Sequence, residues 1–175
     1  LGQNQLFQLR REKGFLKENL LALLEIATQN DRLGESIHKV TIEIIKAYDL
    51  KRLLEIFASC LKVEFHVADP VIKILNFKKS DNYDSRAADQ EIELVLGNLD
   101  SPICTKTPIT ISNKWFKEIH TLKSFLYCPI IGSSKLGILV LASTEEEHYN
   151  EDLDFVFLKR LVEVFALRLE GLKLN

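Results

Sequence analysis

The feature that most constrains this chain is a long stretch at its start that is almost free of residues that stop helices. Between Gln3 and Ala47 there is no Pro, and the only glycines are Gly14 and Gly34. A continuous helix over this stretch would be about 68 Å long at 1.5 Å per residue. The remaining ~125 residues would form a globule only about 36 Å across. Such a helix cannot bury its whole apolar face on its own domain.

The apolar residues of this stretch follow a heptad pattern that begins at Leu6. Nine of the thirteen core positions up to residue 48 are Leu, Ile, Ala or Tyr, and Lys13, Asn30 and Gly34 interrupt the pattern. A buried Asn can fix the register of a coiled coil. The pattern predicts a homodimer through a seam made of Leu6, Leu9, Leu16, Leu20, Leu23, Ala27 and Asn30. The alternative is two shorter helices that break near 30–34 and fold back as a hairpin.

The domain organisation follows from this helix. We expect residues 1–48 to form a dimerisation helix, with a kink near 30–34 if it bends, and residues 49–175 to form the globular domain. Asp49 is the predicted N-cap of a second helix. That helix would bury one face, formed by Leu50, Leu53, Leu54, Phe57 and Leu61.

Beyond residue 63 the pattern becomes that of short strands. Residues 71–77 predict a strand, 78–90 an exposed loop, 91–97 a short helix and 109–111 another strand. Ser112 is the predicted cap of a helical turn. Residues 124–131 and 136–143 are apolar runs joined by a Gly-containing turn, which predicts a hairpin at the centre of a sheet. Pro129 predicts a bulge or a local edge in that hairpin.

A terminal helix is predicted over residues 150–172. Its predicted inner face is Leu153, Val156, Phe157, Leu161, Val164 and Leu167, with acidic residues at its start and Arg168 at the solvated rim. The fold class is therefore α+β, an antiparallel sheet flanked by helices and preceded by a long coiled-coil-type helix.

Composition narrows the classes of function. Lys and Arg total 23 against 25 Asp and Glu, a net charge of −2, so we expect no nucleic-acid partner. No apolar run reaches the roughly 18 residues of a membrane span. Three widely spaced cysteines and no signal peptide predict a cytoplasmic protein. The chain has no Met and begins at Leu1, so we expect a fragment or a sequence from which modified methionines were dropped.

Motifs for common chemistry are absent from the sequence. There is no GxGxxG, GxxxxGK[ST], HExxH, GxSxG or CxxC. We expect no catalytic residues and no metal site, and the sequence identifies no cofactor. The four histidines, His38, His66, His120 and His148, are expected to be structural or solvated.

Several segments resemble a known family. Gln29, Asn30, Asp31, Leu33, Ile37 and His38, within residues 18–65, match the pattern of domain-of-unknown-function family 484, an uncharacterised bacterial family. The segments SPIC (101–104), SFLYCPI (124–130) and LGILVLAS (136–143), together with Tyr149, are similar to later parts of that family. The resemblance implies a GAF-like domain of the kind found in sensory proteins, preceded by a long dimerising helix, and implies no established ligand or activity.

Two well-known ligands of GAF domains do not fit this sequence. The Asn-Lys-Phe-Asp-Glu constellation of cyclic-nucleotide-binding GAF domains is absent, and no Cys adjoins a His as in bilin-binding ones. The aromatic residues Trp115, Phe116, Phe125 and Tyr127 could line a pocket between the sheet and residues 99–120, or could simply be core.

The cysteines differ in their expected roles. Cys60 and Cys128 are expected to be buried and inert. Cys104 follows Pro102 at an irregular turn, in the part of a GAF domain that overhangs the pocket, and is a candidate pocket residue. A GAF-fold thiol enzyme of the free methionine sulfoxide reductase type is therefore an alternative, although no second Cys lies near Cys104 in the sequence.

The sequence thus favours a non-enzymatic, homodimeric GAF-like domain for sensing, signalling or protein interaction. Its partners would be a second copy of itself and an unidentified small molecule or protein. A scaffold with a filled core, acting only through protein contacts, is the alternative from another class.

Overall fold

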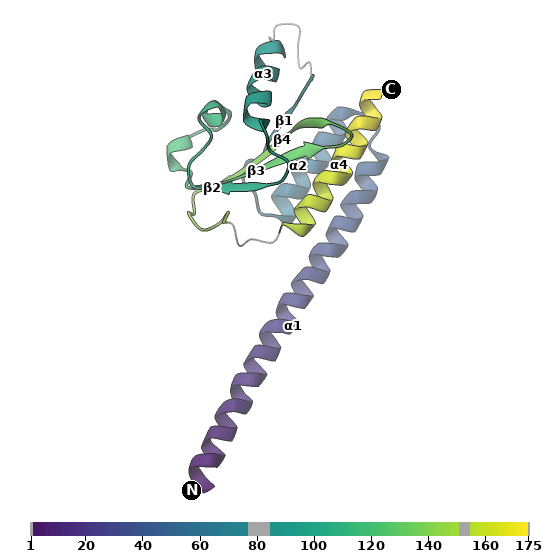
Figure 1. The fold of residues 1–175 in the computed structure, drawn as a ribbon. Helices are drawn as coiled ribbons and strands as arrows, with labels where there is room; N and C mark the ends of the chain where they lie inside the picture. The colour runs from purple at the N-terminus through teal and green to yellow at the C-terminus, as the bar shows by residue number, and fades with distance from the viewer. Residues whose placement is uncertain (1, 77–84, 151–154, 175) are drawn as a thin grey trace. The chain divides into compact units, whose positions relative to one another are not determined.

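The first element is a single long helix. The computed structural model describes residues 2–76, 85–150 and 155–174. Helix α1 spans Gly2–Lys46 and continues through residues 30–34 (Figure 1), so the alternative of two helices folded into a hairpin is wrong. The chain divides into two compact units, Leu1–Lys39 and Val40–Asn175.

The second unit contains a four-stranded antiparallel sheet. Its strands are β1 (Val71–Ile74), β2 (Ile103–Thr105), β3 (Ser124–Ile131) and β4 (Lys135–Ser143). Their order is β1-β4-β3-β2, so the predicted hairpin of β3 and β4 is confirmed at the centre of the sheet. Pro129 pairs regularly with Ile138, and the predicted irregularity comes just after it, between Ile130 and Ile131.

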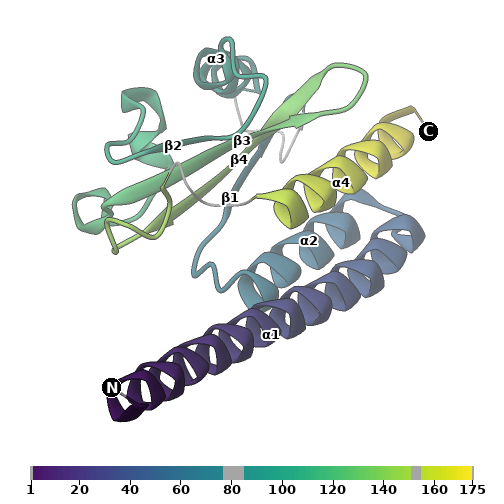
Figure 2. The ribbon, with the colours of Figure 1, turned by 60° about the horizontal axis from the view of Figure 1, so that its bottom comes forward.

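Helices cover both faces of this sheet (Figure 2). Helix α3 (Ser85–Leu96) lies on one face, where it contacts β1 and β4. Helix α4 (Val156–Leu174) packs against β3 on the other face, and α2 (Leu50–Glu64) packs against α4. The rings of Phe57 on α2 and Phe165 on α4 stack with their centroids 4.2 Å apart. The α+β fold class is therefore confirmed.

Helix α2 forms for the reasons that its sequence suggests. The backbone N–H of Arg52 donates to the Asp49 carboxylate at 2.7 Å, so the predicted N-cap is confirmed. Leu53, Phe57 and Leu61 are fully buried, as expected for the core face.

Several local predictions are wrong. Residues 85–90, predicted as loop, belong to α3, which also contains most of the short helix predicted at 91–97. The strand predicted at 109–111 is largely the start of a 3-10 helix, Thr110–Trp115, and a second 3-10 turn follows at Ile119–Thr121. Ser112 lies inside the first of these, so it is not a cap; its hydroxyl donates to the Ile109 carbonyl. Residue 77 and the loop predicted for residues 78–84 lie outside the described residues.

The predicted inner face of α4 is wrong in part: Leu161 is buried as predicted, but two other members of that face are not. Val156 and Leu167 are exposed, whereas the buried residues are Leu158, Leu161, Val162, Phe165, Ala166 and Leu169. Helix α4 packs against both β3 and α2, so its buried surface is wider than a single stripe and periodicity alone does not identify it. Arg168 is not at a solvated rim, because its Nε and Nη2 donate to the Ala47 carbonyl at 2.9 and 2.7 Å. Leu153 and the predicted acidic start lie outside the described residues.

Candidate functional site

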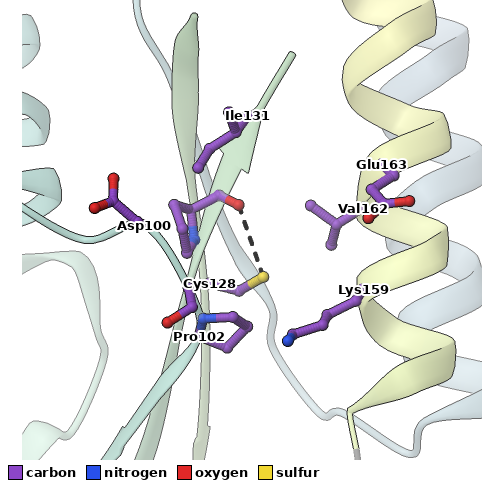
Figure 3. A pocket seen from close by; sticks show the side chains of 9 residues that line it. Asp100, Pro102, Cys128, Ile131, Lys159, Val162 and Glu163 are labelled. Carbon is purple, nitrogen blue, oxygen red and sulfur yellow. Dashed lines mark hydrogen bonds between the residues drawn. The ribbon is translucent and has the colours of Figure 1, made fainter.

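A cavity lies between the sheet and helix α4 (Figure 3). Its volume is about 290 Å³, near the lower end of the range for small-molecule sites. Three segments line it: the approach to β2, the second half of β3 and the first turns of α4. The lining residues are Asp100, Ser101, Pro102, Cys128, Pro129, Ile131, Lys159, Val162 and Glu163.

The electrostatics of this cavity are mixed. The Lys159 side chain extends from α4 toward β3, near Cys128 (Figure 3). Its ammonium favours the Cys128 thiolate, but burial outweighs that effect and raises the pKa of the thiol to about 12. The Cys128 thiol is therefore protonated at neutral pH and unreactive, with the Pro129 carbonyl 3.8 Å from its Sγ.

Lys159 and Glu163 have charges available for a ligand. They are one turn apart on α4, and within the described residues neither side chain forms a hydrogen bond or an ion pair. Asp100, by contrast, pairs with Lys135 at 3.4 Å. Proline and valine side chains add apolar surface to the lining. The cavity can therefore hold a small molecule that carries opposite charges beside an apolar group.

The aromatic residues predicted to line a pocket lie on the other face of the sheet. Phe125 and Tyr127 are fully buried in a core cluster, against which Trp115 and Phe116 pack. The Phe116 and Phe125 rings meet edge-on at 5.6 Å. The structure thus brings these four residues together, and the ligand pocket proposed for them stays a prediction.

Hydrogen bonds fix the position of Tyr127. Its hydroxyl oxygen accepts from the Ile109 N–H at 2.9 Å and shares a hydrogen bond with Ser112 Oγ at 2.8 Å. These contacts hold the first 3-10 helix against the sheet. Nearby in β2, the Thr105 hydroxyl is buried and has no hydrogen-bond partner within the described part of the chain.

Cys104 is separated from the aromatic residues. It lies in strand β2, not in the irregular turn that the sequence suggested, and it pairs with Leu126. Its neighbours in β2 pair with Phe125 and Tyr127, and successive side chains of a strand point to opposite faces. Cys104 therefore faces the α4 side of the sheet. There its thiol adds to the effect of burial in raising the pKa of Tyr149 to about 12.

The other two cysteines are buried, as the sequence predicts. Burial, with Glu64 and Glu43 as lesser causes, raises the pKa of Cys60 to about 11. Neither Cys60 nor Cys128 therefore supplies a thiolate at neutral pH to resolve an oxidised Cys104. The thiol-enzyme alternative stays an untested prediction.

Metal ligands do not converge in the part of the chain that the structure describes. Across residues 2–76, 85–150 and 155–174, no three His, Cys, Asp or Glu side chains are placed to hold a metal ion. His148, which was expected to be solvated, lies 3.7 Å from the Glu145 carboxylate. In the same ranges, no helix combines the length and the apolar character that crossing a bilayer requires.

The predicted seam residues share one face of α1, and all are exposed in the single chain. The exposed fractions of Leu6, Leu9, Leu16, Leu20 and Leu23 lie between 51% and 67%, and Ala27 and Asn30 are exposed as well. A row of half-exposed leucines along one helix face is an apolar surface of the kind that marks an interaction site.

The cavity beside α4 was missed at the sequence level. Lys159 and Glu163 are spaced by four residues and flank the face formed by Leu158, Leu161 and Val162. The correct choice of the α4 face would have placed both charges at the sheet. Because α4 packs against both β3 and α2, its buried surface is wide, and the sequence pattern did not single out that face.

Comparisons with known proteins place this chain in a family without a known activity. No curated protein matches it. Fifteen chains of solved structures match its fold. One is a fragment, residues 122 to 287, of a methyl-accepting chemotaxis protein, with a TM-score of 0.54, 13% sequence identity and coverage of 81% of this chain and 99% of that one. A family model described as a protein of unknown function, DUF484, matches residues 1–173, so the chain belongs to the DUF484 family.

Proposed function

We propose that this protein is a homodimeric, GAF-like sensory or signalling domain. Residues 3–30 pair with a second copy, and the globular unit receives a small molecule or a protein partner. The observation that carries the proposal is the row of half-exposed leucines along one face of a continuous helix of 45 residues. A single helix in water gains nothing from such a row, whereas a second helix buries it.

Two further observations support the sensory part. The fold resembles that of a fragment of a chemotaxis protein. The cavity beside α4 offers an ammonium, a carboxylate and apolar surface to a small molecule. Binding there would change the contacts of α4, whose Arg168 holds the Ala47 carbonyl just after the end of α1. Ligand binding in the globular unit can therefore change the contacts at the end of α1.

Sedimentation velocity at micromolar concentration tests the homodimer. We expect a dimer for the unchanged protein and a monomer for the Leu16→Asp/Leu20→Asp variant, because each substitution places a charge in an apolar layer. Leu94→Asp is the matched control: Leu94 on α3 is 65% exposed, close to the 67% of Leu16. It should leave the dimer intact. A monomeric unchanged protein would refute the proposal.

A thermal-shift screen of small metabolites tests the ligand. A compound that binds the cavity should raise the melting temperature of the unchanged protein and have a smaller effect on the Lys159→Ala variant. A compound that stabilises both proteins equally would bind elsewhere.

The scaffold without a ligand is the second candidate. It is favoured by one observation: Phe125 and Tyr127 have no exposed surface, so the aromatic residues on the α3 side are packed as core. A screen without any stabilising compound, in a protein that still dimerises, would favour the scaffold over the sensor.

A further inference from the structure

We propose that the two copies pair in parallel and in register, with Glu12 of each helix beside Lys17 of the other. This inference rests on the homodimer proposed above. It concerns the direction of the second helix, which the row of leucines alone does not determine.

The polar residues of the seam give the first argument. The eight core positions of residues 6–30 are Leu6, Leu9, Lys13, Leu16, Leu20, Leu23, Ala27 and Asn30. In a parallel pair in register, each layer contains two copies of one residue. Lys13 then meets Lys13 and Asn30 meets Asn30, which leaves the other six layers apolar. The Asn side chains can hydrogen-bond to each other across the seam.

An antiparallel pair places polar side chains opposite leucines in more of the layers. The register of greatest overlap places Lys13 opposite Leu23 and Asn30 opposite Leu6, each of them twice. Four of the eight layers then combine a polar side chain with a leucine, instead of two layers with matched polar side chains. The parallel pair does oppose two Lys13 ammonium groups. Their long side chains can reach water at the edge of the seam, where Glu12 of the partner lies.

The charges beside the seam give the second, independent argument. Glu12 immediately precedes a core position, and Lys17 comes five residues later. In a parallel coiled coil, residues at these two positions lie next to each other on opposite helices. The two-fold symmetry creates this pair twice. In the antiparallel register, Lys17 lies opposite Lys17 of the partner, where like charges repel.

Nothing within the single chain explains this pair of charges. Residues five apart on one helix do not face each other. Among the described residues, the side chains of Glu12 and Lys17 make no ion pair and no hydrogen bond. In the neighbouring heptads, the corresponding pairs are Gln5 with Arg10 and Asn19 with Leu24. Glu12 with Lys17 is thus the one oppositely charged pair at these positions.

A parallel pair has a structural consequence for signalling. Both chains leave the seam at the same end, so residues 40 onward of the two copies follow the same end of one coiled coil. A change that twists or shifts one helix then acts on both copies at once.

Charge exchange tests the direction of pairing. Glu12→Lys alone and Lys17→Glu alone should each weaken the homodimer about tenfold, because both ion pairs turn into repulsions. An equimolar mixture of the two variants should form heterodimers about as tight as the unchanged homodimer, since both pairs are then opposite in sign. The double variant E12K/K17E should also regain the original affinity.

A matched control uses the far side of the same helix. Arg11→Glu and Glu18→Lys change charge in the same way at positions that face away from the seam, and their mixture should show no preference for heterodimers. Sedimentation equilibrium gives the affinities, and energy transfer between two dye labels reports the heterodimers.

Disulfide cross-linking gives a second readout, in a Cys104→Ser background that leaves only the two buried cysteines. Leu9→Cys should form a disulfide dimer on air oxidation, because a parallel pair places the two copies of residue 9 in one layer. In the antiparallel register they are about 27 Å apart along the axis, too far for a disulfide. Arg11→Cys is the control that should not cross-link.

The outcomes separate the two proposals. A monomeric unchanged protein would overturn the homodimer itself. A dimer without the heterodimer preference and without the Leu9→Cys cross-link would overturn the parallel pairing and leave the homodimer standing.

Discussion

Helix α1 and the central hairpin use the same kinds of residue in opposite situations. In β4, Ile138, Leu139 and Val140 have no exposed surface. In α1, Leu16 and Leu20 are 67% and 58% exposed. Both segments carry rows of large aliphatic side chains. The difference is in the covering surface: the hairpin is covered by helices of its own chain, whereas the row on α1 is exposed in the single chain, and in our proposal a second copy covers it.

The sharpest test of this contrast compares one core residue with one seam residue. Phe165→Ala should reduce the free energy of unfolding by about 3–5 kcal/mol at any protein concentration, because Phe165 is fully buried against Phe57. Leu16→Ala should alter stability only where the unchanged protein is dimeric. Urea denaturation at two protein concentrations checks both. Equal effects of Leu16→Ala at both concentrations would contradict the contrast.

The next largest effect concerns the hydrogen bonds that Arg168 of α4 donates to the Ala47 carbonyl, just after the end of α1. Arg168→Met should destabilise the globular unit by about 1.5–3 kcal/mol, because the Ala47 carbonyl loses two charge-assisted hydrogen bonds. Arg11→Met, on the exposed part of α1, should change stability by less than about 0.5 kcal/mol. Urea denaturation measures both values. Similar decreases in the free energy of unfolding for the two variants would show that the hydrogen bonds between Arg168 and Ala47 do not stabilise the unit.

One substitution should have opposite signs in the two regions. Gly137→Ala places a methyl group 2.2 Å from the Lys73 backbone carbonyl, so β1 must shift, at about 1–3 kcal/mol. Gly14→Ala meets no atom within 4 Å in the single chain and should stabilise α1 by about 1 kcal/mol through helix propensity. Circular dichroism during thermal unfolding checks the two signs. A loss for Gly14→Ala would indicate that another helix approaches closely at that point.

The smallest effect depends on pH. Burial raises the pKa of Cys128 from 9.0 to about 12 in the folded state. As pH rises, the unfolded chain therefore loses the Cys128 proton before the folded protein does. The contribution of the neutral thiol to the free energy of unfolding is full below pH 9 and decreases as pH rises toward 12. The loss should reach about 1 kcal/mol at pH 10, relative to pH 8.

Other groups titrate in the same range, so the comparison requires a variant. Cys128→Ala should remove this part of the pH dependence while it leaves the contributions of lysines and tyrosines. If the free energy of unfolding changed equally with pH for both proteins between pH 8 and 10, the Cys128 thiol would make no contribution to the pH dependence.

The sequence predicts best where one pattern permits a single geometry. The central hairpin follows from two apolar runs around a glycine turn, whereas the long stretch without proline still permitted a break near 30–34. The Asp49 cap is equally local. Each of these features depends on neighbours within a few residues, so the sequence contains the whole cause.

The site was harder to predict because its causes are not local. Cys104 faces α4 because β2 pairs with β3 in one particular register, which three residues of sequence do not specify. Residues 109–111 are bent into a 3-10 helix that the Tyr127 hydroxyl holds from a distant strand. Lys159 borders a cavity because of the way α4 packs against β3, which the sequence of the helix alone does not specify.

The stacked rings of Phe57 and Phe165 also set an order of events during synthesis. The core around Phe57 cannot close until the ribosome has added the last helix, and the roughly 100 residues between the two rings take about 5–20 s at 5–20 residues per second. Helix α1 has no such dependence, because its first thirty residues belong to a separate unit. In the homodimer that we propose, two nascent chains on one messenger can therefore join through α1 before either globular unit has folded.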